Sequence, residues 1–211
     1  MLEKLEEMCY DLNFDEEKAF GYVKQTNIND EFETTKLWDL PYTTVLLAEA
    51  VKCNNIRMVE LLLKNGANPN QIYDVTESAF WNLQYEGETK EEDEIRLKTV
   101  QLFLEYGANP NIALDAEDDD LFEMALWGIF DGSEEDYCNY EFLYNYDRSW
   151  RYLSRFLILL IAYGGKTTYC VPKIIGEFDK SNMQQYRLRF LINADYRAKI
   201  IDSDKNIIAY I

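Results

Sequence analysis

The chain has no histidine among its 211 residues, so it lacks the side chain most often used as a general base at neutral pH. Without an imidazole, neither a Ser-His or Cys-His nucleophile nor a zinc site of mixed cysteine and histidine ligands can be built. The phosphate-binding motifs GxxxxGK[ST] and GxGxxG are also missing. These absences argue against an enzyme, and we expect no catalytic residue, cofactor, metal ion or small-molecule substrate.

Cysteines and long apolar runs are scarce as well. The four cysteines, Cys9, Cys53, Cys138 and Cys170, show no CxxC spacing, which favours reduced thiols over a disulfide framework. The longest apolar run covers residues 156–163 and is too short to cross a bilayer, and no signal-peptide pattern opens the chain. We therefore expect a cytoplasmic protein that does not contact a membrane.

Basic residues are outnumbered, with 21 lysines and arginines against 39 aspartates and glutamates, a formal net charge of −18. The excess is uneven, because residues 111–147 hold twelve acids and no base. A polyanionic surface repels nucleic-acid phosphates and attracts basic proteins. We therefore expect no direct nucleic-acid binding and a protein partner that is basic. The alternative is that the charge serves only solubility.

The pentapeptide GANPN occurs twice, at residues 66–70 and 107–111. Before the first copy, apolar residues recur at helical spacing in two groups, which predicts two helices joined by a tight turn. The groups are Leu46, Leu47 and Ala50, then Ile56, Val59, Leu62 and Leu63. Glycine commonly ends such a helix at positive φ, and Asn-Pro-Asn then forms a turn. A helix hairpin cannot bury its apolar faces alone, so the units should stack.

The segment LLAEAVKCNNIRMVELLLKNGANPN resembles the helix-turn-helix unit of the ankyrin repeat family. Leu47 and Ala50 stand at the leucine and alanine of the family's TPLHxA signature, and VELLLKNGANPN matches its second helix and exit. Val45 and Leu46 replace the Thr-Pro pair, and the histidine is missing, so the repeat is a divergent one of bacterial type. The resemblance implies a protein-binding scaffold.

The predicted fold is mainly α, an ankyrin-like helix-hairpin solenoid of about four units with a small C-terminal antiparallel β appendage. Residues 40–165 would hold the repeats with their insertions. Residues 1–39 show helical spacing and a worn exit, that is, a degenerate copy of the turn that follows the second helix of a repeat. This predicts an atypical N-terminal capping repeat. Residues 166–211 end in alternating apolar residues and predict a β-rich cap, which either closes the solenoid or offers an edge to a partner.

The repeat spacing indicates insertions. Gly66 and Gly107 are 41 residues apart, and Gly164 follows after another 57, against ~33 for an ideal ankyrin unit. Both surpluses are expected between the two helices of a unit, as enlarged inter-helix loops. Insertions at equivalent points emerge on one edge of a solenoid, so their acids should form one acidic rim. The acids are Glu88, Glu91, Glu92, Asp93, Glu94, Glu134, Glu135 and Asp136.

Two further groups are candidates for partner binding, namely tyrosines in the longer surplus and acids before the third unit. They are Tyr137, Tyr140, Tyr144, Asp118, Asp119 and Asp120. Tyrosine is frequent among binding hot spots, but these rings could instead pin the long loop to the solenoid. The aspartates could equally cap a helix. A calcium loop is excluded, because Asp120 stands where an EF-hand requires glycine.

The expected function is that of a non-catalytic protein-protein interaction module that binds, and neutralises or regulates, a basic protein. Small, acidic, divergent ankyrin-like proteins of bacteria suggest an immunity protein that holds a toxin inactive. Two alternatives remain open. One is a nucleic-acid mimic that inhibits a DNA- or RNA-handling enzyme, and the other is a purely structural assembly scaffold.

Overall fold

The computed structural model describes most of the first 112 residues and part of one later helix. The described residues are 1–37, 40–74, 77–84, 86–112, 152–153, 155–157, 159–160 and 162–165. The chain divides into two compact units. The first comprises Met1–Asn109 and Leu114–Asp118, and the second comprises Pro110–Ala113 and Asp119–Ile211.

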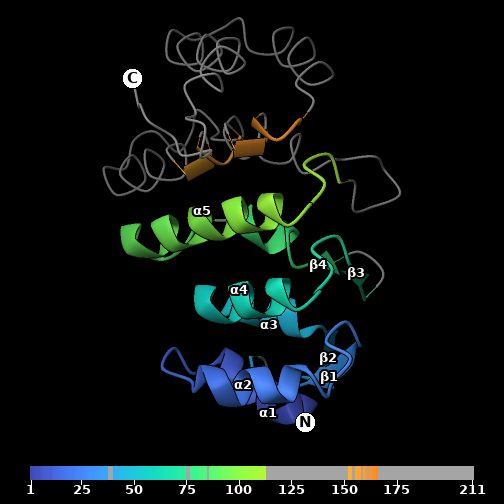
Figure 1. Ribbon diagram of the computed structural model, residues 1–211. Helices are drawn as coiled ribbons and strands as arrows, with labels where there is room; N and C mark the ends of the chain where they lie inside the picture. Colours follow the sequence, from blue (N-terminus) through green and yellow to red (C-terminus); the bar gives the residue numbers. More distant parts are fainter. Residues whose placement is uncertain are drawn as a thin grey trace, which may run out of the picture. The chain divides into compact units, whose positions relative to one another are not determined.

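Helix pairs follow one another as layers in the first unit (Figure 1). The first pair is α1 (Leu2–Cys9) and α2 (Glu16–Val23), and the second is α3 (Leu46–Lys52) and α4 (Ile56–Lys64). The third layer consists of the short 3₁₀ turn η1 (Trp81–Leu83) and the long helix α5 (Lys90–Glu105). The two helices predicted before the first GANPN copy are confirmed as α3 and α4.

Local signals define the α3–α4 hairpin. Asn54 has a φ of +53°, which turns the chain sharply between the helices, and the Asn55 side chain caps α4 by accepting from the Met58 N–H at 3.2 Å. Gly66 has a φ of +92°, and the Ala67 N–H closes the helix end on the Leu62 carbonyl at 3.0 Å. The exit glycine predicted from the repeat therefore has the expected conformation.

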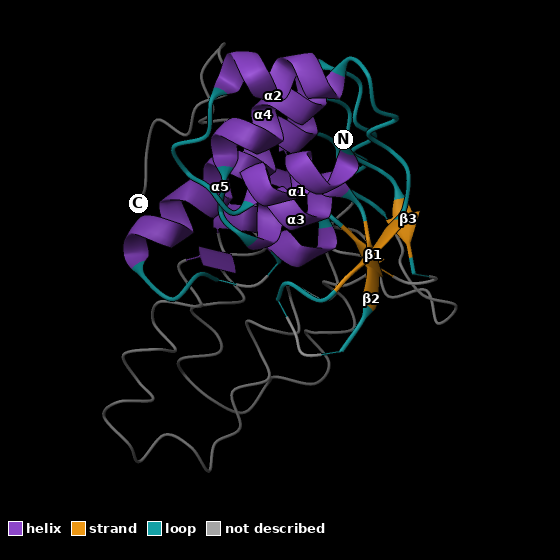
Figure 2. Ribbon diagram, turned by 90° about the horizontal axis from the view of Figure 1, so that it is seen from below, coloured by secondary structure: helices purple, strands orange, loops and turns teal. Residues whose placement is uncertain are grey.

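Short antiparallel strands precede the second and third layers. We call β1 (Phe32–Thr34) with β2 (Tyr42–Thr44) the first finger. We call β3 (Ile72–Tyr73) with β4 (Glu77–Ser78) the second finger. Both fingers lie on the same side of the helix layers (Figures 1 and 2). The sequence predicted only a turn after each exit, since strands of two or three residues are too short to show a periodic pattern.

An asparagine in each exit joins successive layers of the first unit. Asn70 Nδ2 donates to the Gly107 carbonyl at 2.9 Å, and its Oδ1 accepts from the Asn109 N–H at 2.6 Å. Asn29, 41 residues earlier, makes the same two bonds with Gly66 and Asn68, at 3.2 and 2.8 Å. The worn exit near residue 29 therefore makes the same contacts as the first GANPN exit.

The same asparagine contact recurs in the second unit. Asn111, another 41 residues along the chain, donates through Nδ2 to the Gly164 carbonyl at 3.2 Å. Gly164 has a φ of +94°, and helical residues are described between 152 and 162. These observations agree with the prediction of a second helix before Gly164, in the repeat that follows η1 and α5 in the chain. Its first helix, its long insertion and the predicted C-terminal β cap lie outside the described residues.

The first insertion differs from the expected loop. Seven residues, 90–96, extend α5 beyond the point where α4 begins in the equivalent repeat, while the preceding helix is reduced to η1. Val59 and Val100 are fully buried, which supports this alignment of the two repeats. Lysine and glutamate favour helix, and Thr89 caps it, so the segment lengthens the helix instead of looping out. The prediction of an enlarged inter-helix loop is wrong for residues 90–94.

Candidate partner-binding surfaces

The start of α5 carries the part of the predicted acidic rim that the structure describes. Thr89 Oγ1 accepts from the Glu92 N–H at 3.2 Å, and Glu92 Oε2 accepts from the Glu88 N–H at 2.7 Å. Asp93 Oδ1 accepts from the Gly87 N–H at 2.8 Å. These bonds satisfy backbone donors at and just before the helix N-terminus, where a negative charge is also favourable.

Glu92 and Asp93 therefore act within the fold. Asp93 is buried, and a Cβ at Gly87 would lie 2.4 Å from the Cβ of Glu92, so the turn packs tightly on the helix. Both residues cap the helix start, and their predicted role in partner binding stays a prediction. Glu88, Glu91 and Glu94 are exposed, as a binding surface requires.

The other predicted site residues lie outside the part of the chain that the structure describes. They are Asp118, Asp119, Asp120, Glu134, Glu135, Asp136, Tyr137, Tyr140 and Tyr144. Whether they gather with the acids of α5 therefore stays a prediction.

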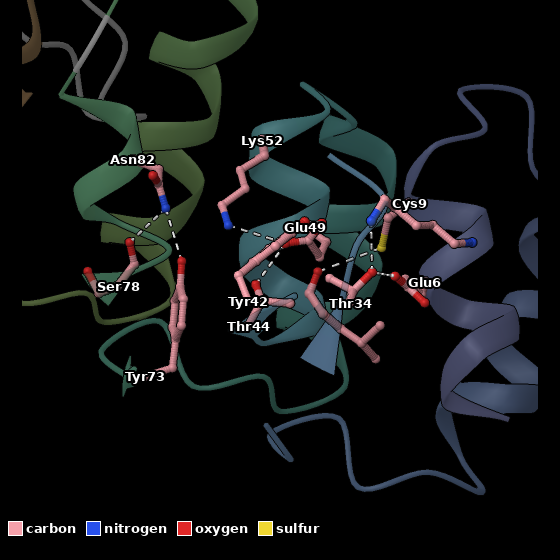
Figure 3. Close-up of polar contacts among 12 residues, drawn as sticks. Glu6, Cys9, Thr34, Tyr42, Thr44, Glu49, Lys52, Tyr73, Ser78 and Asn82 are labelled. Carbon is pink, nitrogen blue, oxygen red and sulfur yellow. Dashed lines mark hydrogen bonds and ion pairs between the residues drawn. The ribbon is translucent and has the colours of Figure 1, made fainter. Parts of the chain in front are cut away.

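Sequence reasoning missed a buried carboxylate, Glu49, at the centre of a polar cluster on α3 (Figure 3). Tyr10 OH donates to Glu49 Oε2 at 2.5 Å, and Tyr42 OH donates to the same oxygen at 3.0 Å. Thr44 Oγ1 and Lys52 Nζ donate to Oε1 at 2.7 and 3.3 Å. The carboxylate thus links the first layer, the first finger and α3.

Neighbouring layers use related contacts to fix the fingers. Thr34 Oγ1 of β1 donates to the buried Glu6 carboxylate of α1. In the third layer, Asn82 of η1 donates to the hydroxyl of Tyr73 at 3.1 Å and to the carbonyl of Ser78 at 3.2 Å (Figure 3). In each of the three layers, a polar side chain of the first helical segment (α1, α3 or η1) therefore hydrogen-bonds to a finger strand.

Burial and the nearby carboxylate change the acidity of the tyrosines in this cluster. Burial, followed by the hydrogen bond to Glu49, raises the pKa of Tyr10. Burial is also the largest cause that raises the pKa of Tyr42, and Glu49 adds to it. Lysines lie over both rings, Lys52 at 4.7 Å from the centroid of Tyr42 and Lys36 at 5.5 Å from that of Tyr10. Burial and the Glu49 carboxylate therefore hold both phenols in the protonated, donating form.

These raised values predict a loss of stability at high pH. A free phenol ionises at about pH 10. Above that pH the unfolded chain loses protons that folded Tyr10 and Tyr42 retain, so the stabilisation is complete below about pH 10 and falls as the pH rises further. We expect the free energy of unfolding in urea to fall less steeply above pH 10 in Tyr10→Phe than in the unmodified chain. Equal slopes in the two proteins would contradict the prediction.

The described residues include two cysteines. Cys9 and Cys53 are free thiols, as predicted, and burial raises the pKa of Cys53 to about 11, so it stays protonated at neutral pH. In this part of the chain, no group of three or more candidate ligands could hold a metal ion. Nor is any described helix long and apolar enough to span a membrane.

Comparison with known families agrees with the geometry. The family model described as ankyrin repeat matches residues 43–74, which include α3, α4 and the exit through Asn70. No curated protein and no solved structure matches the chain. The family match covers the hairpin whose capping, exit glycine and finger strands are described above. The chain therefore carries an ankyrin repeat at residues 43–74.

Proposed function

We propose that this protein binds a basic protein partner and neutralises or regulates it, with an immunity protein that inactivates a toxin as the favoured case. Ankyrin repeats generally mediate protein-protein interaction, and the matched repeat supports that class of function. The proposal that the partner is basic is supported by the three exposed carboxylates of Glu88, Glu91 and Glu94, in a chain of net charge −18.

The helix start of α5 presents these carboxylates on a fixed backbone. The capping bonds of Thr89, Glu92 and Asp93 order the turn and the first helical residues before any partner arrives. A preorganised surface loses less conformational entropy on binding. Lys90, also exposed, lies among the three acids and is outnumbered by them. The net local charge favours a cationic surface and should raise the rate of association at low salt.

The test compares two triple variants with the same change in net charge. Glu88→Lys, Glu91→Lys and Glu94→Lys are combined in one protein, and the exposed acids Glu3, Glu7 and Glu17 are changed to lysine in the other. The partner is captured from source cells with the unmodified chain, identified by mass spectrometry, purified, and its binding to each variant is measured. We expect the α5 variant to lose about tenfold or more in affinity, mainly in association rate.

The control separates local from overall charge. If both triple variants bind equally weakly, the whole-chain field and not the start of α5 would explain the attraction. If the captured partner is acidic, or binds the α5 variant as tightly as the unmodified chain, the proposal is wrong. A purely structural scaffold would bind its partner as tightly through the α5 variant as through the unmodified chain.

The acidic run at residues 111–147 favours one alternative, a nucleic-acid mimic. In that case DNA or RNA should compete for the captured partner. The affinity should also fall steeply and linearly with the logarithm of salt concentration, as expected when several phosphate-binding cations are neutralised. A partner held in part by apolar contacts should retain more of its affinity at high salt.

A further inference from the structure

Lys52, the last residue of α3, places its ammonium group close to both fingers. Its Nζ lies 4.7 Å from the ring centroid of Tyr42, in β2 of the first finger, and 5.8 Å from that of Tyr73, in β3 of the second finger. Figure 3 shows Tyr73 on one side of the ammonium, with Glu49 and Tyr42 on the other. A cation within about 6 Å of a ring centroid is attracted to the ring face, so one ammonium group contacts both fingers.

The surroundings of this ammonium group are largely closed to water. The Lys52 side chain is 10% exposed, the Glu49 side chain is fully buried, and Nζ lies 3.3 Å from Glu49 Oε1. Tyr73 is buried as well. Attraction between a cation and a carboxylate or a ring is stronger in such a place than in water, where solvent screens it.

Hydrogen bonds tie each finger to the two sides of the lysine. Thr44 Oγ1 of the first finger donates at 2.7 Å to Glu49 Oε1, the oxygen that also pairs with Lys52. In the second finger, the hydroxyl of Tyr73 accepts from Asn82 Nδ2 of η1 at 3.1 Å, which fixes the ring that Lys52 contacts. An unbroken series of contacts therefore runs from the first finger through the lysine to the second finger and the third layer.

We infer that Lys52 couples the two fingers, so that opening of one finger makes opening of the other easier. When the first finger opens, water reaches the ion pair of Glu49 and Lys52, screens the ammonium and weakens its attraction for the Tyr73 ring. When the second finger opens, loss of the Tyr73 ring exposes the same ammonium from its other side. Partial openings of this kind occur in folded proteins, and a shared group makes them depend on one another. The inference is independent of the proposed function, because it involves no partner.

The experiment is a double-mutant cycle between the fingers, made with and without the lysine. Tyr42→Leu, Tyr73→Leu and the two changes together are introduced into the unmodified chain and into Lys52→Met, and urea unfolding gives the equilibrium constant of each protein. In the unmodified chain, we expect the combined effect on this constant to depart from additivity by about fivefold. In the Lys52→Met background, the departure should be less than about twofold, because methionine keeps an extended apolar chain without the charge.

Lys24→Met is the matched control, since it removes an ammonium group that lies 4.0 Å from the ring centroid of Phe20 on α2. The coupling between the fingers should be unchanged in it. Equal coupling with and without Lys52 would overturn the inference and favour another route, such as the hydrogen bond that Gln71 Nε2 donates to the Asn29 carbonyl at 2.7 Å. Additive effects in the unmodified chain would overturn it as well.

A second background covers the case in which Lys52→Met does not fold because the buried carboxylate has lost its cation. Lys52→Met combined with Glu49→Gln removes the cation together with the negative charge. The departure from additivity should again fall below about twofold there, and a departure as large as in the unmodified chain would contradict the inference.

Discussion

Glu49→Ala is expected to lower the free energy of unfolding by about 3–5 kcal/mol, the range for removing one partner from a buried charge pair. The carboxylate is fully buried and accepts four hydrogen bonds, including the ion pair with Lys52, whose side chain is only 10% exposed. In the alanine variant, three hydroxyls and one ammonium group of a largely enclosed cluster lose the carboxylate that accepts their hydrogen bonds. It also leaves a cavity between the first layer, the first finger and α3.

The measurement is urea unfolding followed by circular dichroism, with Glu60→Ala as the matched control. Glu60 also pairs with a lysine on a helix, Lys64, at 2.6 Å, but both side chains are about half exposed. An exposed pair contributes about 0–1 kcal/mol. Glu49→Gln, which keeps the shape and one acceptor oxygen, should fall between the two alanine variants. Equal losses for Glu49→Ala and Glu60→Ala would show that the buried cluster does not stabilise the fold.

Phe103→Ala is expected to cost about 3–5 kcal/mol, as is typical of a buried phenylalanine. Phe103 of α5 stacks on Phe80, which precedes η1, with 5.5 Å between ring centroids and 8° between ring planes. Both side chains are fully buried. The pair replaces packing that a full first helix would provide in this layer, so its loss should separate the short η1 segment from α5.

Phe20→Ala serves as the control for Phe103→Ala. Phe20 of α2 is 39% exposed, and the ammonium of Lys24 lies 4.0 Å from its ring centroid. We expect a loss of less than about 1 kcal/mol there, because little apolar area is removed from the interior. A loss at Phe103 as small as that at Phe20 would mean that the third layer is not a packed part of the first unit.

Local sequence signals predicted the α3–α4 hairpin well. The apolar spacing of two short helices, the exit glycine and the Asn-Pro-Asn turn each act over a few residues, so they can be read without knowledge of distant contacts. The worn exit at Asn29 was recognised for the same reason. The first insertion was placed correctly in the chain, but its conformation was not, because composition alone does not show whether added residues form a loop or lengthen a helix.

The roles of individual acids depended on distant partners. Glu92 and Asp93 look like Glu91 and Glu94 in the sequence, yet the first two cap the helix start and the second two are exposed. Glu49 has one signal in the sequence, as a single acid inside the apolar segment LLAEAVK, and that signal does not show whether the carboxylate is buried. Its partner Tyr10 lies 39 residues away, so only the folded chain brings the two together.

The sequence by itself determined the ankyrin repeat at residues 43–74, the two GANPN exit turns and the acidic, histidine-free composition, because all of these are properties of the chain. The tertiary structure decided which carboxylates are buried, which cap a helix and which remain exposed. It also decided that Leu37 and Leu40 stay exposed on a finger. Burial and capping arise from contacts between layers, and those contacts exist only once the helix hairpins have stacked.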